Sequence, residues 1–415
     1  VAAWGRYAVG SLCVVMGSGS AVFALNFNDP LIEAVQNMQP VSFPPPPGRE
    51  EIQKNWGGFR GPGGLAIYSS PAPTKWNGPS DENIIWKTAL QLPGTNSPIA
   101  WGERVFLTGS DGSKNELYCF NATDGKLLWQ KSVDAGGPPP KVNKDTGFAA
   151  STPVTDGRLV YAMFAGGIVG AFDFSGKQIW RQNLGPIENL YGHASSLVLL
   201  GDLLIAQVDH GDADAGKSKL IALSALTGKP AWQTSRKVPH SWPTPLPINI
   251  HGRDLIVTAA NPWVIAYDAA SGAEVWKAQC LSGDIAPSPV YGDGIVFATQ
   301  EGSQLAAIRA DGQGDVSKTH IAWTFDEDLP DICSPLSDGK NVLTLTTHGM
   351  LNCFDAKTGK KAWSKDFECE FHASPNQAGD KLYLLNREGV MFILAAGAEL
   401  KEIGKAELGE RCSAG

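Results

Sequence analysis

The chain has 415 residues, of which 43% are hydrophobic, and this content excludes disorder along its whole length. Its 42 Asp and Glu residues outnumber 34 Lys and Arg, giving a net charge of −8, which argues against a nucleic-acid partner. The 47 Gly, 28 Pro and 13 Trp residues indicate many short strands joined by tight turns, and the seven cysteines form no C-x-x-C pair for zinc or redox chemistry.

Residues 1–27 predict a membrane anchor or a signal segment. Residues 7–27 carry no charge and would cross a bilayer as a transmembrane helix at about 1.5 Å rise per residue. Arg6, just before them, favours a cytoplasmic N-terminus. A signal-peptide core or a buried helix is the alternative, because the Gly and Ser residues at positions 17–20 weaken the hydropathy. Anchor and signal both place the rest of the chain outside the cytoplasm.

Residues 28–55 predict a Pro-rich linker. Four consecutive prolines at positions 44–47 fit neither a helix nor a central strand, so this stretch is expected to be a stiff, extended spacer. The folded domain is then expected over residues 56–415.

A pattern ending in A-x-D-x-x-T-G-x-x-x-W recurs along this domain. One copy contains Asp355, Thr358, Gly359 and Trp363, and Ile403 takes the Trp position in the last copy. The Trp residues, 40 to 52 residues apart, are Trp86, Trp129, Trp180, Trp232, Trp276, Trp323 and Trp363. This period is typical of a propeller blade of four short strands. Each Asp-x-x-Thr-Gly segment predicts a hairpin turn, and each Trp predicts a structural contact that docks one blade on the next.

The units also share an opening, a small residue followed in most copies by Pro. These steps are Ser97-Pro98, Thr152-Pro153, Ser195-Ser196, Thr244-Pro245, Ser288-Pro289, Ser334-Pro335 and Ser374-Pro375. The sequence therefore predicts an all-β fold, a β-propeller of seven to eight four-stranded blades. Trp86 in front and residues 410–415 behind resemble parts of a further, incomplete blade, so the count between seven and eight stays open.

At these motifs the chain resembles the PQQ-like, quinoprotein-type repeat family of β-propellers, over roughly residues 86–410. The segment from Asn55 to Gly64, NWGGFRGPGG, is similar to the opening of planctomycete-type PQQ-repeat proteins. The resemblance implies either a PQQ-dependent dehydrogenase with calcium or a cofactor-free propeller like BamB. The chain lacks the adjacent Cys-Cys pair of the large dehydrogenases, and no match to their catalytic Asp or calcium ligands is found. The better expectation is a protein without a cofactor that is not an enzyme.

Propellers commonly bind ligands at the mouth of the central funnel, just before each innermost strand. Two positions before each Ser equivalent stand Thr95, Ala150, His193, Trp242, Ala286, Ile332, His372 and Arg411. Four of them, His193, Trp242, His372 and Arg411, could bind an anionic or aromatic ligand or a peptide. The alternative is that each one caps a turn or packs between blades.

A second candidate is the acidic loop that contains Asp209, Asp212 and Asp214. Alternating carboxylates with Gly resemble a calcium loop, but the distal Glu of an EF-hand is missing. A solvated loop is favoured over a metal site.

These observations lead to three hypotheses. The first is an exported scaffold anchored in the inner membrane, with its propeller in the periplasm, that binds a protein, a peptide or another cell-envelope ligand. The second is a small PQQ-dependent dehydrogenase with calcium at the funnel. The third is a structural spacer that binds nothing.

Overall fold

The computed structural model describes residues 11–15, 22–26, 43–397 and 399–412. It divides into two compact units, Val1–Pro45 and Pro46–Gly415. In the first unit, β1 (Ser11–Val15) and β2 (Val22–Asn26) form an antiparallel pair where the sequence predicted a helix. The other residues of that segment lie outside the described ones, so the anchor or signal stays a prediction. No described helix is both long enough and apolar enough to cross a membrane.

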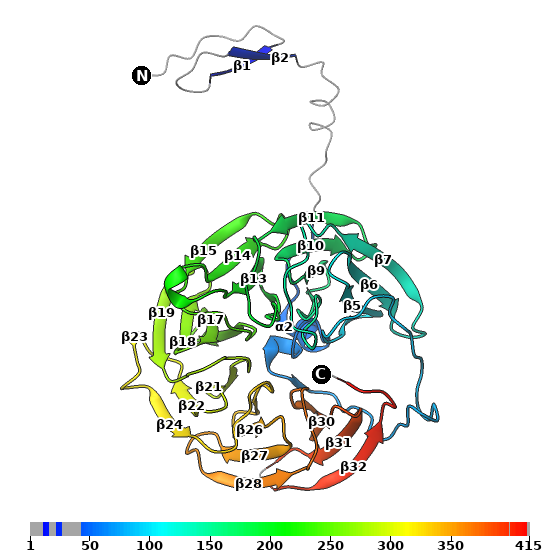
Figure 1. Ribbon diagram of the computed structural model, residues 1–415, viewed down its shortest axis with the longest axis vertical. Helices are drawn as coiled ribbons and strands as arrows, with labels where there is room; N and C mark the ends of the chain where they lie inside the picture. The colour runs from blue at the N-terminus through cyan, green and yellow to red at the C-terminus, as the bar shows by residue number, and fades with distance from the viewer. Residues whose placement is uncertain (1–10, 16–21, 27–42, 398, 413–415) are drawn as a thin grey trace. The chain divides into compact units, whose positions relative to one another are not determined.

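The second unit is a ring of seven four-stranded blades, seen face-on in Figure 1. Blade 1 consists of β4 (Ile99–Trp101), β5 (Arg104–Ser110), β6 (Asn115–Asn121) and β7 (Leu127–Val133). Blade 2 consists of β8 (Val154–Thr155), β9 (Leu159–Met163), β10 (Ile168–Asp173) and β11 (Gln178–Asn183). Blade 3 consists of β12 (Val198–Leu200), β13 (Leu203–Val208), β14 (Lys219–Ser224) and β15 (Pro230–Ser235). Blade 4 consists of β16 (Leu246–Ile250), β17 (Arg253–Ala260), β18 (Trp263–Asp268) and β19 (Glu274–Gln279). Blade 5 consists of β20 (Val290–Gly292), β21 (Ile295–Thr299), β22 (Leu305–Arg309) and β24 (Ile321–Phe325). Blade 6 consists of β25 (Leu336–Ser337), β26 (Asn341–Leu345), β27 (Met350–Asp355) and β28 (Lys361–Asp366). Blade 7 consists of β29 (Asn376–Ala378), β30 (Lys381–Leu385), β31 (Val390–Ala395) and β32 (Glu402–Glu407).

Two short strands extend this pattern. β23 (Gly314–Asp315), from the long insertion before Trp323, adds to β19 of blade 4 in parallel. β3 (Ile67–Tyr68) adds in parallel to β29 of blade 7. Outside the sheets lie the short helix α2 (Arg49–Gln53) and the single turns η1 (Pro62–Gly64) and η2 (Ala213–Ala215).

Burial follows the position of each strand in its blade. The second strand of blade 2, β9 (LVYAM), is buried at every residue because both faces pack on neighbouring blades. The outer strand β28 (KAWSKD) instead alternates between half-buried and exposed residues, as expected for a strand with one face in water. The apolar runs of the repeat therefore become the packing surfaces between blades.

The D-x-x-T-G turn and the Trp act together across each blade junction. In blade 6, the Asp355 carboxylate accepts hydrogen bonds from the Thr358 N–H and hydroxyl at 2.8 and 2.7 Å, which shapes the turn. Gly359 has φ of 70°, and a Cβ at this position would lie 2.5 Å from the ring of Trp323 in blade 5. Only glycine allows both the positive φ and the close approach of the indole.

The indole N–H groups complete these junctions. Each of six donates to a backbone carbonyl of the following blade: Trp86 to Ala122 (2.8 Å), Trp129 to Phe174 (3.1 Å), Trp180 to Ala225 (2.7 Å), Trp232 to Ala269 (2.9 Å), Trp276 to Ala310 (2.9 Å) and Trp323 to Ala356 (3.0 Å). Trp363 faces blade 7, whose turn departs from the motif, and its N–H has no acceptor among the described residues.

The ring closes through the segment that precedes blade 1. After β3, Gly78 N–H donates to the Glu407 carbonyl of β32 at 2.7 Å. The same segment then carries Trp86 onto the first turn of blade 1. Trp86 thus supplies the blade 7 to blade 1 junction, where the repeat position in blade 7 holds Ile403, and no eighth blade is formed by the described residues.

We expect Trp86→Ala to loosen this junction locally. The loss of packing and of the indole hydrogen bond should lower the free energy of unfolding by about 2 kcal/mol, less than for a Trp in a core because Trp86 is only partly buried. Hydrogen exchange should rise at β32 and in the turn after Asn121, while blades 3 to 5 stay protected. Ile85→Ala is the control, since Ile85 is largely exposed and its loss should leave exchange unchanged. A uniform rise in every blade would contradict local closure by Trp86.

Candidate functional site

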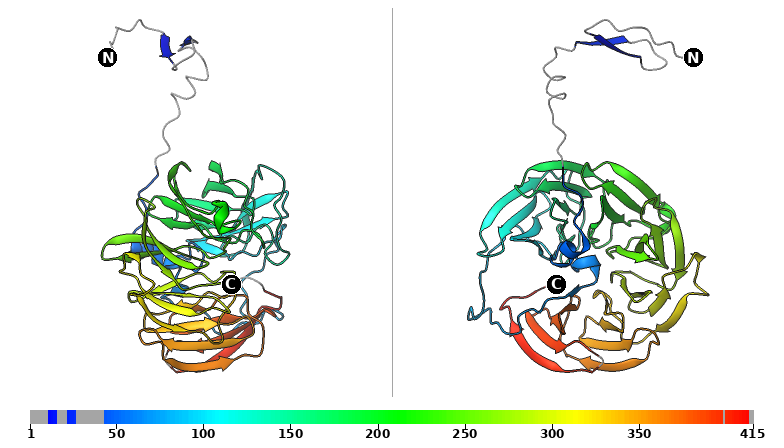
Figure 2. Two further views of the ribbon diagram at one scale, coloured as in Figure 1. Left: turned by 60° about the vertical axis from the view of Figure 1, so that its left-hand side comes forward. Right: turned by 180° about the vertical axis from the view of Figure 1, so that it is seen from behind.

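The N-terminal part of the second unit crosses the centre of the ring. Figure 1 shows α2 in the middle of the blades, and the view from behind in Figure 2 shows the same blue segment there. The Trp56 carbonyl accepts a hydrogen bond from Ala100 of blade 1 at 2.8 Å, and the Gly57 carbonyl accepts one from Thr155 of blade 2 at 2.7 Å. The Ala66 carbonyl accepts one from Gln377 of blade 7 at 2.8 Å. We call residues 55–66 the plug.

A belt of hydroxyl groups lies above the plug, built from the residue that opens each unit. The belt residues are Ser97, Thr152, Ser196, Thr244, Ser288, Ser334 and Ser374. The backbone N–H of each of the first six donates to the hydroxyl of the next, at 2.9 to 3.1 Å. Six hydrogen bonds therefore join all seven blades at one level of the channel.

A cavity of about 500 Å³ fills the channel between the plug and the open mouth. Its floor includes Trp56, Phe59 and Arg60 of the plug, and its wall is the hydroxyl belt. Its mouth is lined by the residues that stand two positions before each belt residue in the sequence. These are Thr95, Ala150, Ala194, Trp242, Ala286, Ile332 and His372. The plug contacts residues that follow the belt residues in sequence, whereas the mouth residues come before them. Because each inner strand runs along the channel, the plug and the mouth lie at opposite ends of it.

Two of the four predicted funnel residues, Trp242 and His372, line this cavity. His193 does not, because the belt residue of blade 3 is Ser196 rather than Ser195, which moves the mouth position to Ala194. Burial lowers the pKa of His193 to about 4, so its ring is neutral at physiological pH. Arg411 does not line the cavity either; it follows β32, the last strand of the described residues.

The structure holds Trp242 firmly at the mouth. Its backbone N–H donates to the Ile285 carbonyl and its indole N–H donates to the Gly192 carbonyl, both at 3.0 Å. The Tyr191 ring lies 5.2 Å from the indole. At the opposite side, Nε2 of His372 lies 3.2 Å from Nη1 of Arg387, and burial together with this guanidinium lowers the pKa of His372. The mouth is therefore preorganised before any ligand arrives.

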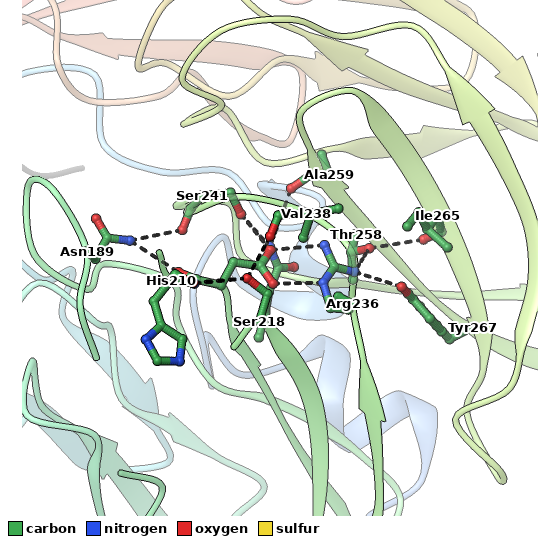
Figure 3. Close-up of polar contacts among 12 residues, drawn as sticks. Asn189, His210, Ser218, Arg236, Val238, Ser241, Thr258, Ala259, Ile265 and Tyr267 are labelled. Atoms are coloured by element: carbon green, nitrogen blue, oxygen red, sulfur yellow. Dashed lines mark hydrogen bonds and ion pairs between the residues drawn. The ribbon is translucent and has the colours of Figure 1, made fainter. Parts of the chain in front are cut away.

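Asp209 is not the solvated loop residue that the sequence favoured, because it is buried. Its side chain is fully buried and pairs with the fully buried Arg236, which is labelled in Figure 3, at 2.8 Å to Nε and 3.0 Å to Nη2. Ser241 and Gln207 donate to the same carboxylate at 2.7 and 2.9 Å. Arg236 also donates to the hydroxyls of Thr258 and Tyr267 on blade 4. Although burial opposes it, the Asp209 carboxylate raises the pKa of Arg236.

The remaining carboxylates of that loop stay apart from Asp209. Asp212 and Asp214 are exposed at η2, while Asp209 points into the junction of blades 3 and 4. Within the described ranges no three His, Cys, Asp or Glu side chains gather as a metal ion requires. The three Asp residues are thus not brought together as a set of metal ligands.

The sequence-based search passed over Arg60. The side chain belongs to the NWGGFRGPGG segment that suggested the family resemblance, but nothing in its local pattern indicates burial in a channel. The one sequence signal for Arg60 is the position of that segment, which lies just before the first blade and outside the repeat.

The propeller resembles known proteins over most of its length. The family model described as "Outer membrane protein assembly factor BamB" matches residues 73–208, 216–332 and 316–398. The chain belongs to this family. A BamB of Yersinia pestis is 30% identical over 227 residues, which cover 52% of this chain and 56% of that protein. The crystal structure of BamB from Moraxella catarrhalis has the same fold, with a TM-score of 0.56 at 17% identity over 77% of this chain and 89% of that chain.

A dehydrogenase is also similar to this BamB-family chain. The polyvinylalcohol dehydrogenase of Sphingopyxis sp. (strain 113P3) is 24% identical over 325 residues, covering 67% of this chain and 46% of that protein. The chain spans about half the length of these two curated relatives, 56% of the Yersinia pestis protein and 46% of the dehydrogenase.

The residues of the cavity do not fit an anionic quinone with calcium. One guanidinium, Arg60, lies on the floor, and the carboxylates that line the cavity, Asp145, Asp284 and Asp331, come from three different loops. These three do not form a metal-binding group. No quinone chemistry is therefore derived for this site.

Proposed function

We propose that this propeller is a binding scaffold that docks a protein of the cell envelope at the mouth of its channel. The observation that carries the proposal is an apolar surface around the mouth. Leu190 is 62% exposed, Tyr191 40% and Ile332 40%, next to the fixed indole of Trp242. Large apolar side chains on the surface around a concavity are typical of protein interaction sites.

The geometry favours docking over catalysis. Trp and Tyr anchors that are already held in place lose little conformational entropy on binding, so they commonly carry much of the affinity of an interface. Family membership supports a protein partner, since the relatives are named outer membrane protein assembly factors. We further propose that the protein is exported, with residues 7–27 as its inner-membrane anchor or signal, so that the mouth lies in the periplasm.

The test is site-specific photo-crosslinking in the cells that make the protein. A photoreactive residue at Leu190 should give discrete adducts with an envelope protein, identified by mass spectrometry. The same residue at Leu128, an equally apolar exposed position on β7, is the matched control and should give none of these adducts.

The variant Tyr191→Ser/Ile332→Ser should reduce the Leu190 adducts about tenfold or more, as expected for the loss of two apolar contacts at an interface. Leu127→Ser, which removes exposed apolar surface elsewhere, should not. Adducts of the same pattern at both positions, or adducts that survive the double substitution, would refute docking at the mouth.

A further inference from the structure

The floor of the cavity contains a buried cation that the docking surface does not use. Arg60 is 5% exposed and lines the cavity. Its Nη2 donates to the Pro335 carbonyl at 2.6 Å, directly after the belt residue Ser334. Its Nε and Nη1 have no hydrogen-bond partner among the described residues. Two of the three guanidinium nitrogens are thus buried donors without an acceptor.

No acidic group neutralises this guanidinium in the part of the chain that the structure describes. The nearby Cys333 is no counter-ion, because burial raises the pKa of its thiol far above neutral pH. Burial lowers the pKa of Arg60 to about 10, so the side chain still carries its charge at physiological pH. A buried charge without a partner costs several kcal/mol, and a protein keeps one mainly where something else offsets the cost.

The belt supplies further donors beside Arg60. The hydroxyl oxygens of Thr152, Ser196, Thr244, Ser288, Ser334 and Ser374 each accept a backbone N–H. None of these six hydroxyls donates to a protein acceptor among the described residues, so each proton is available toward the cavity. A ring of O–H donors around one guanidinium is suited to a hydrogen-bond acceptor that carries a negative charge.

The rest of the lining limits what can carry that charge. Asp145, Asp284 and Asp331 line the cavity nearer the mouth, so a ligand with several negative charges is repelled. Trp56 and Phe59 beside Arg60 offer apolar ring surface to the body of the ligand. A cavity of about 500 Å³ holds a small organic molecule or the end of a side chain.

We propose that Arg60 and the hydroxyl belt form a binding site for a single carboxylate attached to an apolar or aromatic body. The carboxylate compensates the charge of the Arg60 guanidinium, whose side chain lines the cavity, and accepts hydrogen bonds from belt hydroxyls. This site deepens the proposed function, and it rests on that function only for the source of the carboxylate, which is either a free small molecule or a side chain of the docked protein.

The probe is benzoate, titrated into the full chain at low ionic strength and followed by saturation-transfer NMR and thermal shift. Benzoate should bind saturably, with a dissociation constant on the order of 1 mM. Benzamide, which has the same shape without the charge, should not bind. Isophthalate, with a second carboxylate, should bind more weakly because of the acidic mouth.

Arg60→Met should weaken benzoate binding about tenfold or more through loss of the positive charge beside the cavity. Its melting temperature should stay the same or rise, because the unpaired charge is gone. A second pair of variants leaves the plug intact: Ala286→Asp adds a negative charge to the lining and should weaken benzoate binding, while Ala286→Asn should not.

The proposal is overturned if the unmodified chain gives no saturable benzoate signal, if benzamide matches benzoate, or if Arg60→Met keeps full binding while its melting temperature falls. These outcomes are independent of the Leu190 crosslinks, which test docking. If Arg60→Met also removes those crosslinks, the carboxylate belongs to the docked protein. If the crosslinks persist while benzoate binding is lost, the ligand is a small molecule.

Discussion

Replacing Asp209 with asparagine is expected to lower the free energy of unfolding by about 3–5 kcal/mol, the usual cost of removing one partner of a buried ion pair. The substitution keeps the shape of the side chain but leaves the fully buried Arg236 without its counter-ion. Chemical denaturation followed by Trp fluorescence measures the loss. Because Ser241 donates to Asp209 and precedes Trp242, the mouth should also lose some of its order.

The matched control is Glu402→Gln. Glu402 pairs with Lys365 at 2.6 Å, but both side chains are partly in water, so this change should cost less than about 1 kcal/mol. In the double variant Asp209→Asn/Arg236→Gln the cost should fall well below the sum of the two single variants, because no buried charge remains unpaired. A loss under about 1 kcal/mol in Asp209→Asn would show that the pair contributes little.

Trp276→Ala is expected to lower the free energy of unfolding by a similar amount, about 3–5 kcal/mol, as found for large-to-small substitutions in a packed interior. Trp276 is fully buried between blades 4 and 5, where it contacts an extended apolar cluster. Its indole N–H also donates to the Ala310 carbonyl at 2.9 Å, which would lose its partner. The same denaturation experiment reports the effect.

Trp363→Ala is the control at the equivalent repeat position. Trp363 is half-buried and its indole N–H has no acceptor among the residues described, so its loss should cost clearly less. Equal losses for the two variants would mean that the repeat position alone, and not the burial and hydrogen bond at each junction, determines the contribution of the Trp.

The propeller could be predicted from the sequence because its signals are local. Asp355, Thr358 and Gly359 form a turn through contacts within five residues, and the same pattern recurs in the other blades. Trp242 and His372 line the cavity for the same reason, since they stand at a constant offset from a recognisable step, while their role in binding stays a prediction. His193 does not line the cavity, because the step Ser195-Ser196 has no Pro and the belt residue, Ser196, comes one residue later.

The blade count and the channel floor had no such local signal. Trp86 looked like the end of an earlier blade, yet it reaches blade 1 from a segment that lies along β32. Whether a repeat array closes with seven or eight blades depends on how its two ends meet, and that contact joins residues more than 300 positions apart in the chain.

By itself, the sequence determined that this protein is a propeller of quinoprotein-type repeats, with Trp residues at its blade junctions. Tertiary structure alone decided that seven blades close the ring, that the plug forms the floor, and that Asp209 pairs with Arg236 instead of a metal. The physical reason is the range of the contacts: a turn depends on neighbouring residues, whereas Arg60 meets Pro335 across 275 positions. Arg60 is buried with no counter-ion in the described part of the chain, and this burial, together with the carboxylate site inferred from it, follows from that long-range contact.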